Sequence, residues 1–206
     1  QLVANVDSAM RLSEAFASAL RDEYFKDCVL DALEFGVSRA RARYGNRYRD
    51  TDFVLYEKYS LEEICKLLRW EEEPKAYINI SGYRFDRSTN TFPVFVNYDK
   101  SPNISVTTRY EDRFISRTRF IAISKSRRTL ESPEIKRLMN WRENGIRVYL
   151  FVRKNKDDGD GAKEFYFLGQ MHPTGEFEQV VMGDGKTSAV EITYELDQPV
   201  RADLYD

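Results

Sequence analysis

The chain has 206 residues, of which 42% are hydrophobic, 14% aromatic and 32% charged, and its mean hydropathy is -0.59. This length suits one domain with or without an appendage, and the composition is that of a folded protein with a charged surface. No apolar run approaches the roughly 18 residues of a membrane-spanning helix, and the N-terminus lacks a basic, apolar and small-residue series. We therefore expect an intracellular, cytoplasmic protein.

Two cysteines and one histidine limit the chemistry that the chain can perform. Cys28 and Cys65 each lie among apolar residues, so we expect both to be buried, reduced thiols. A zinc site needs several well-spaced Cys or His ligands, and a histidine-pair phosphodiesterase needs two histidines, whereas His172 is the only one. The sequence therefore predicts no metal and no cofactor.

Positive charge is concentrated in two segments, although the formal net charge is -2. Residues 39–49 hold five arginines and no acid, and residues 105–128 hold seven basic residues against two acids, so each segment carries +5 and the remainder carries -12. Such polarity suits a polyanion bound on one face, because phosphate contact depends on local potential. The alternative is that these arginines pair with acidic residues of the same chain.

Helical periodicity dominates the first fifty residues. Apolar residues at three- and four-residue steps predict a helix from about Glu23 to Arg43, and residues 8–20 suit a shorter helix before it. Gly45 is typical of a helix end. We expect residues 1–52 to form a helical coupler segment.

A third helix begins at Ser60, because Ser60 and Glu63 have the spacing of a capping box. After it, the period changes from helical to alternating. The predicted strands and turns cover residues 78–80, a turn at 86–91, and residues 92–96, 119–124, 148–152, 165–168, 177–182 and 189–196.

One helix interrupts these strands, beginning at Ser132 and Pro133, extending through Trp141 and ending by Gly145. About seven strands with one inserted helix are most economically arranged as a curled antiparallel sheet or a small barrel. The predicted fold class is α+β, with residues 53–206 as the sheet domain.

Two short patterns resemble catalytic motifs without their context. Residues 183–187 look like the end of a phosphate-binding P-loop, but Val180 occupies the place of the required first glycine, so we interpret them as a hairpin turn. Glu134 and Lys136 have the Glu-x-Lys spacing of many metal-dependent nucleases, but they lie in a predicted helix with no partner aspartate.

Aromatic, hydroxyl and charged side chains are concentrated in residues 77–128. Hydroxyls and cations directly after a strand suit phosphate positioning, and an aromatic ring beside a carboxylate suits one base held by stacking and edge hydrogen bonds. Stacking contributes about 1–3 kcal/mol per base, which offsets the cost of unstacking it. The alternative is that Tyr110 and Phe114 are core residues and Asp112 pairs with Arg113.

The candidate site residues follow from this interpretation. The candidate base-binding residues are Tyr110, Asp112, Tyr83 and Tyr98. The candidate phosphate-binding residues are Arg113, Lys125, Ser126, Arg127, Arg128 and Lys100. No catalytic residue is expected.

Several segments resemble one bacterial family. They are Leu55–Ser60, Asn79–Tyr83, Thr91–Val96, Tyr110–Phe114, Ser124–Ser126, Arg128–Leu130 and Pro199–Tyr205. The chain resembles the C-terminal domain of unknown function attached to superfamily 2 helicase and phospholipase-D-type nuclease modules, as in SauUSI-like modification-dependent (type IV) restriction enzymes. The similarity spans 151 of 206 residues and departs from the family pattern at Ser81, where a glycine is expected.

The resemblance implies a target-recognition domain of a phage-defence system, with a PUA-like or SRA-like barrel that flips a modified cytosine out of DNA. It implies two kinds of partner: double-stranded modified DNA, and the helicase and nuclease domains of the same parent chain. The fragment itself is then not an enzyme. Two alternatives stay open: an interaction domain that docks on the helicase through its arginines, and a metal-dependent nuclease built on Glu134 and Lys136.

Overall fold

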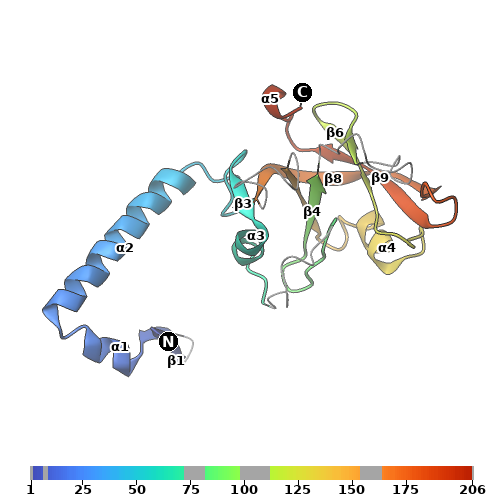
Figure 1. The fold of residues 1–206 in the computed structure, drawn as a ribbon. Coiled ribbons are helices and arrows are strands. Elements are labelled where there is room, and N and C mark those ends of the chain that lie inside the picture. The colour runs from blue at the N-terminus through green and yellow to red at the C-terminus, as the bar shows by residue number, and fades with distance from the viewer. Residues whose placement is uncertain (1, 7–8, 72–81, 98–111, 154–163, 206) are drawn as a thin grey trace. The chain divides into compact units, whose positions relative to one another are not determined.

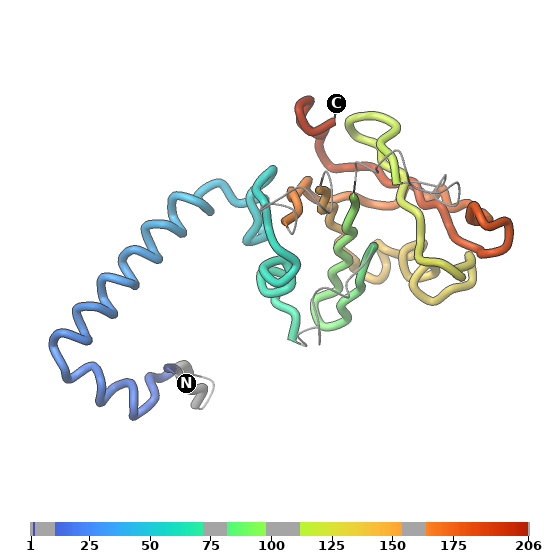
Figure 2. Tube along the Cα trace, viewed as in Figure 1, coloured from blue at the N-terminus to red at the C-terminus, as the bar shows by residue number. Residues whose placement is uncertain are grey.

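The structure is a computed structural model, and it describes residues 2–6, 9–71, 82–97, 112–153 and 164–205 (Figure 1). The chain divides into two compact units, residues 1–46 and residues 47–206. Figure 2 follows the trace of each unit along the chain. Among the described residues, no helix is both long enough and apolar enough to cross a membrane.

The first unit begins with a β-hairpin where the sequence predicts a helix. Strand β1 (Val3–Val6) pairs antiparallel with β2 (Ala9–Leu12), and α1 (Glu14–Ala19) begins after them. The Ser13 side chain accepts a hydrogen bond from the backbone N–H of Phe16 at 3.2 Å and so caps α1. The predicted helix is therefore wrong in its first half, because periodicity does not separate a short apolar strand from a short helix.

The long helix α2 (Glu23–Tyr44) confirms the second predicted helix. The Asp22 carboxylate accepts a hydrogen bond from the backbone N–H of Phe25 at 2.8 Å, which fixes the start of the helix. Cys28 lies on this helix and is exposed, so the expectation of a buried thiol is wrong for Cys28. Cys28 is exposed because no residue of α2 is buried. Cys65 is buried, as expected.

The second unit is built on a curled, unclosed sheet of seven strands. Its order is β4-β7-β8-β9-β6-β5, and β3 pairs with β8 beside this path. The strands are β3 (Lys58–Ser60), β4 (Thr91–Asn97), β5 (Arg113–Phe114), β6 (Arg119–Ile123), β7 (Arg147–Arg153), β8 (Glu164–Val181) and β9 (Ser188–Leu196). The helices are α3 (Leu61–Leu67), α4 (Pro133–Met139) and α5 (Ala202–Tyr205). The α+β class is confirmed.

The sheet is mixed, whereas the sequence predicts purely antiparallel pairing. Strands β4 and β7 run parallel, with Thr91 opposite Arg147. A parallel pair needs a crossover connection, and β5, β6 and α4 lie in the segment between these two strands. Pro93 cannot donate a backbone hydrogen bond, and its place in the end strand β4 is where a sheet tolerates that loss.

Local signals at the turns and helix starts are confirmed, although α4 ends at Met139 and does not extend through Trp141. Ser60 and Glu63 form the reciprocal hydrogen bonds of a capping box at the start of α3. Strands β7 and β8 pair antiparallel, as do β8 and β9. At the β8–β9 turn, the Asp184 carboxylate accepts hydrogen bonds from the backbone N–H groups of Lys186 and Thr187, so residues 183–187 form the expected turn. Pro133 opens α4.

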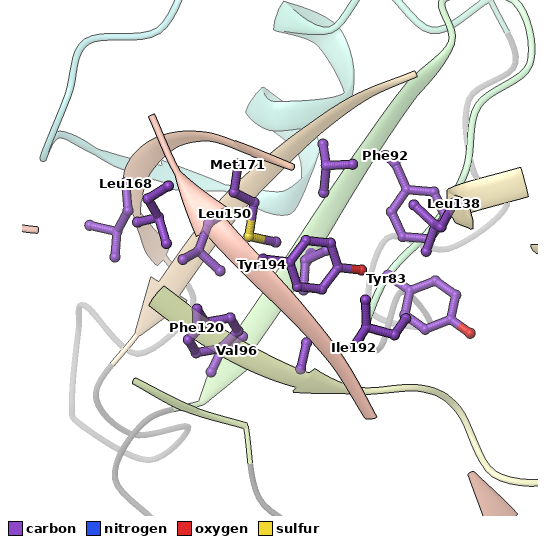
Figure 3. Close-up of a cluster of buried hydrophobic side chains, with 14 of the residues drawn as sticks. Tyr83, Phe92, Val96, Phe120, Leu138, Leu150, Leu168, Met171, Ile192 and Tyr194 are labelled. Atoms are coloured by element: carbon purple, nitrogen blue, oxygen red, sulfur yellow. The ribbon is translucent and has the colours of Figure 1, made fainter. Parts of the chain in front are cut away.

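Strand β7, which lies between β4 and β8, is buried on both faces, which explains its unbroken apolar sequence. One face belongs to the main core, which α4 completes with Ile135 and Leu138. On the other side, the Phe53 ring lies 4.8 Å from the Phe167 ring and 5.3 Å from the Phe151 ring, measured between centroids. Figure 3 shows the main core, with Tyr83, Phe92, Val96, Phe120, Leu138, Leu150, Leu168, Met171, Ile192 and Tyr194 labelled.

A pair of glycine substitutions tests the packing around β8. Gly169 has φ +98°, and a β-carbon there would approach Leu55 to 3.3 Å and the side-chain nitrogen of Gln198 to 3.0 Å. Gly175 has φ +99° with nothing described within 4 Å. Both alanine variants incur left-handed strain, but only Gly169→Ala adds overpacking of about 1–3 kcal/mol. Urea denaturation should therefore show Gly169→Ala as the less stable variant. Equal losses would contradict this packing.

Candidate nucleic-acid interface

The chain leaves β6 through a turn that is anchored to β9. Ser124 is buried, and its hydroxyl accepts a hydrogen bond from the backbone N–H of Val190 at 2.8 Å. The Ser124 N–H donates to the carbonyl of Val190 at 2.8 Å, so the pairing with β9 continues past the end of β6. This anchoring fixes the point from which the next residues leave the sheet.

Residues 125–128 follow this anchor and include three cations. The backbone N–H of Arg127 donates to the carbonyl of Ser188 at 2.7 Å, and Arg127 has φ +63°. A non-glycine residue is strained in this left-handed region. Lys125, Ser126 and Arg127 are exposed. The turn therefore presents cations and a hydroxyl on the surface directly after a strand, as the sequence predicts.

Glu134 connects this turn to the core. The guanidinium of Arg128 donates to the Glu134 carboxylate, and the Tyr83 hydroxyl donates to the same oxygen at 3.3 Å. The Tyr83 hydroxyl in turn accepts from the backbone N–H of Lys125 at 3.4 Å. These contacts join α4, the segment before β4 and the turn after β6 in one network.

Tyr83 is buried and contacts the turn through its hydroxyl. Its side chain is buried, and its ring stacks on Phe92 with centroids 5.0 Å apart. The Lys125 ammonium lies 5.0 Å from the ring centroid of Tyr83. Burial raises the pKa of Tyr83 to about 12, so the hydroxyl keeps its proton and donates to Glu134 at neutral pH.

Positive charges accumulate around Lys125. Partial burial lowers the pKa of its ammonium, which the Glu134 carboxylate opposes. The charges of Arg128 and Arg84 lower this pKa further, which places both guanidiniums in the field of Lys125. An anion here would relieve this repulsion. We call Arg84, Lys125, Arg127 and Arg128 the cationic cluster.

Arg84 and Arg137 are not among the candidate residues expected from the sequence. The Arg84 guanidinium lies over the Trp70 ring at 5.5 Å, and that of Arg137 lies over the Phe85 ring at 4.5 Å. Stacking of a guanidinium on an aromatic ring orders the side chain while its N–H donors stay available at the edge. Alternation of aromatic and cationic residues from Tyr83 to Phe85 is the signal that identifies Arg84.

Asp112 and Arg113 are both engaged within the sheet. The Asp112 carboxylate accepts a hydrogen bond from the backbone N–H of Ile123 at 2.8 Å, at the last residue of β6. The guanidinium of Arg113 donates to both carboxylate oxygens of Glu191 at 3.2 Å each. Asp112 therefore lies close to the anchored turn, whereas the Arg113 charge is compensated by β9.

Ion pairs within the chain account for part of each basic segment. Arg39, Arg41 and Arg43 lie on α2 in the first unit. In the second unit, Arg47 pairs with Asp52 at 2.8 Å, and Arg119 pairs with Glu176 at 2.8 Å. Some arginines of both segments are therefore paired with acids of the same chain, as the alternative interpretation expects. The candidate phosphate-binding surface is the cationic cluster.

Three candidate residues, Tyr98, Lys100 and Tyr110, lie outside the described residues. Among the described ones, Tyr83, Lys125 and Arg128 come together around Glu134, and Ser126 and Arg127 lie in the same turn. The role of each in binding stays a prediction.

The arrangement around Glu134 differs from that expected of a nuclease. Glu134 bonds to Arg128, and the Lys136 ammonium pairs instead with Glu131. Among the described residues, no group of three or more His, Cys, Asp or Glu side chains is placed to hold a metal ion. Glu134 therefore orders cations at this surface.

The contacts of Glu134 predict an acid-dependent contribution to stability. Partial burial opposes ionisation, but the hydrogen bond from Arg128 and further contacts hold the pKa of Glu134 below its ordinary value. A carboxyl whose pKa is lower in the folded state stabilises the fold above its unfolded pKa, about 4.3, and loses this effect as pH falls. Below pH about 4.5, the free energy of unfolding of Glu134→Gln should therefore fall less steeply than that of the parent. Glu143→Gln, at an exposed position, serves as the control, and identical pH profiles for parent and Glu134→Gln would refute the effect.

Comparisons with solved structures give remote similarities. The DNA recognition domain of the cytosine modification-dependent restriction endonuclease LpnPI aligns at TM-score 0.41 and 15% identity, covering 59% of this chain and 63% of that chain. KRYPTONITE in complex with mCHH DNA, an H3 peptide and SAH aligns at TM-score 0.47 and 11% identity, covering 81% and 37%. The sulfur binding and SRA domains of ScoMcrA, complexed with phosphorothioated DNA, align at TM-score 0.42 and 10% identity, covering 100% and 67%.

All three structures extend beyond the aligned part, since this chain spans 63% of the LpnPI domain, 37% of KRYPTONITE and 67% of the ScoMcrA domains. No curated protein matches the sequence. The family described as "Domain of unknown function (DUF3427)" matches residues 53–206, which include the whole curled sheet. The chain therefore belongs to the DUF3427 family.

Proposed function

We propose that the chain is a non-catalytic DNA-binding domain that recognises modified cytosine in double-stranded DNA. The observation that carries this proposal is the anchored turn after β6, which presents Lys125, Ser126 and Arg127 on the surface and holds Arg128 on Glu134. Neutralising phosphates and releasing their counterions supplies most of the affinity of such a surface. A fixed turn adds orientation, because its backbone is bonded to β9.

Phosphate contacts are assigned to the turn. Lys125, Ser126 and Arg127 are exposed and follow one another, so they can contact neighbouring phosphates of one strand. Arg128 keeps its bond to Glu134 and offers its other N–H donors. Arg113 contributes to phosphate binding only if a phosphate displaces Glu191 from the guanidinium N–H groups of Arg113. Lys100 completes the predicted set.

Base recognition is assigned to the candidate residues Tyr110, Asp112 and Tyr98. Tyr110 is the proposed stacking ring and Asp112 the proposed acceptor for an exocyclic amine, with Tyr98 nearby in sequence. The buried ring of Tyr83 suits a positioning role, in which its hydroxyl holds Lys125 and Glu134 in place. The modified cytosine is proposed to be flipped out of the duplex to reach them.

The parent protein is proposed to be a modification-dependent restriction helicase-nuclease that acts in the cytoplasm. The resemblance of residues 55–205 to the C-terminal domain of SauUSI-like enzymes supports this context. In it, the present chain senses the target, and the helicase and nuclease domains of the same chain supply the motion and the cleavage.

A variant at Arg127 separates DNA binding from folding. Arg127→Gly removes one cation, while relief of left-handed strain, about 1–2 kcal/mol, roughly offsets the greater freedom of glycine in the unfolded chain. We expect unchanged thermal stability, weaker binding to every duplex alike, and a log–log salt slope smaller by about 0.9. Fluorescence anisotropy across a salt series measures this.

The matched control is Arg119→Ala, which removes an arginine from the opposite end of β6 where the side chain pairs with Glu176. Its DNA affinity should equal that of the parent. Equal losses for both variants would contradict the assignment of the turn.

Discrimination between duplexes tests the base-binding assignment. We expect the parent chain to bind a duplex with 5-methylcytosine more tightly than the same duplex with cytosine. Tyr110→Ala should remove this preference, because the loss of stacking, about 1–3 kcal/mol, falls only on the recognised base. Competition binding with the two duplexes measures it. Equally weak, salt-insensitive binding to both by the parent chain would instead favour the interaction domain that docks on the helicase.

A further inference from the structure

Helix α2 leaves its apolar side chains uncovered. Leu30, Leu33 and Val37 are 47%, 59% and 48% exposed, and no residue of the helix is buried. Most helical stability in proteins comes from packing an apolar face against another element, because intrinsic propensity alone is marginal in water. Among the described residues of the first unit, no element covers this face.

The face has the seven-residue repeat of a coiled coil. Steps of four and three residues alternate along Lys26, Leu30, Leu33, Val37, Ala40 and Tyr44. This is the spacing of the a and d positions. In two antiparallel copies, a positions lie opposite d positions, so that Leu33 faces Val37 and Leu30 faces Ala40 of the second helix.

The charge of α2 changes sign along the helix. Residues 23–31 carry Glu23, Asp27 and Asp31 against one lysine, and residues 39–44 carry Arg39, Arg41 and Arg43. In an antiparallel copy these acidic and basic ends lie beside one another, with Glu34 beside its own counterpart at the centre, whereas a parallel copy puts the like-charged ends together. The helix dipole favours such charges only in the first and last turns. Asp31 and Glu34 lie in the middle of the helix, so the dipole does not account for them.

Gly36 supports close approach at the centre of the helix. A β-carbon built there would meet no described atom within 4 Å. Glycine inside a helix costs about 1 kcal/mol relative to alanine. In the register that puts Leu33 opposite Val37, Gly36 flanks the two-fold axis, where the missing side chain allows the two backbones to approach.

We propose that α2 is a self-association surface, through which two copies of the chain pair as an antiparallel coiled coil with Leu33 opposite Val37. This proposal is independent of the proposed DNA recognition. In this proposal, the first unit joins two copies of the chain.

Sedimentation velocity of the 206-residue chain tests the interface. The parent should be a dimer, and Leu33→Glu should weaken the dimer at least about 100-fold, because it would bury an unpaired carboxylate. Phe35→Glu is the matched control, since Phe35 is 65% exposed and lies outside the repeat. It should remain dimeric. Circular dichroism verifies that each variant keeps its secondary structure.

Disulfide trapping tests the orientation in a Cys28→Ser background. Leu30→Cys and Ala40→Cys chains should cross-link when mixed and oxidised, and neither should cross-link when oxidised alone. Cross-linking of Leu30→Cys chains with one another would show parallel pairing and overturn the proposed register. A monomeric parent at every accessible concentration, or a dimer that Leu33→Glu leaves intact, would overturn the proposal itself. The monomeric result would favour a helix of another domain as the partner of α2.

Discussion

The carboxylate of Glu134 positions the basic residues of the turn after β6. It accepts hydrogen bonds from Arg128 and from the Tyr83 hydroxyl, and Tyr83 holds the backbone of Lys125. The negative charge of Glu134 lowers the repulsion between Lys125 and Arg128 without neutralising the surface. The network rests on the core, because Tyr83 stacks on Phe92 and α4 contributes Ile135 to the same cluster. Packing in the core therefore also fixes the positions of the side chains on a surface that is suited to phosphate.

Local sequence signals predict the elements whose cause is local. The capping box at Ser60 and the turn around Asp184 are confirmed because the hydrogen bonds that define them join residues within three positions. The same reasoning does not predict the parallel pairing of β4 with β7. Both strands are continuous apolar runs, which suit either direction, so their orientation depends on the long connection between them.

The candidate site is predictable to the extent that its residues are neighbours in sequence. Lys125, Ser126 and Arg127 follow a strand that alternation identifies, and the structure presents them together on the surface. The contacts of Arg113 with Glu191 and of Tyr83 with Glu134 join residues 78 and 51 positions apart. No local pattern encodes such pairs, because they follow from strand order. Hence Arg113 is expected as a phosphate contact and is found engaged with a carboxylate.

The parallel pairing of β4 also constrains the synthesis of the protein. Thr91 is paired with Arg147, about 56 residues later in the chain, so a nascent polypeptide carries the apolar run of β4 without its neighbour until β7 has left the ribosome. An unpaired apolar edge invites association with other chains. Pro93, in the middle of that run, removes one backbone donor and makes the exposed segment a poorer template for aggregation.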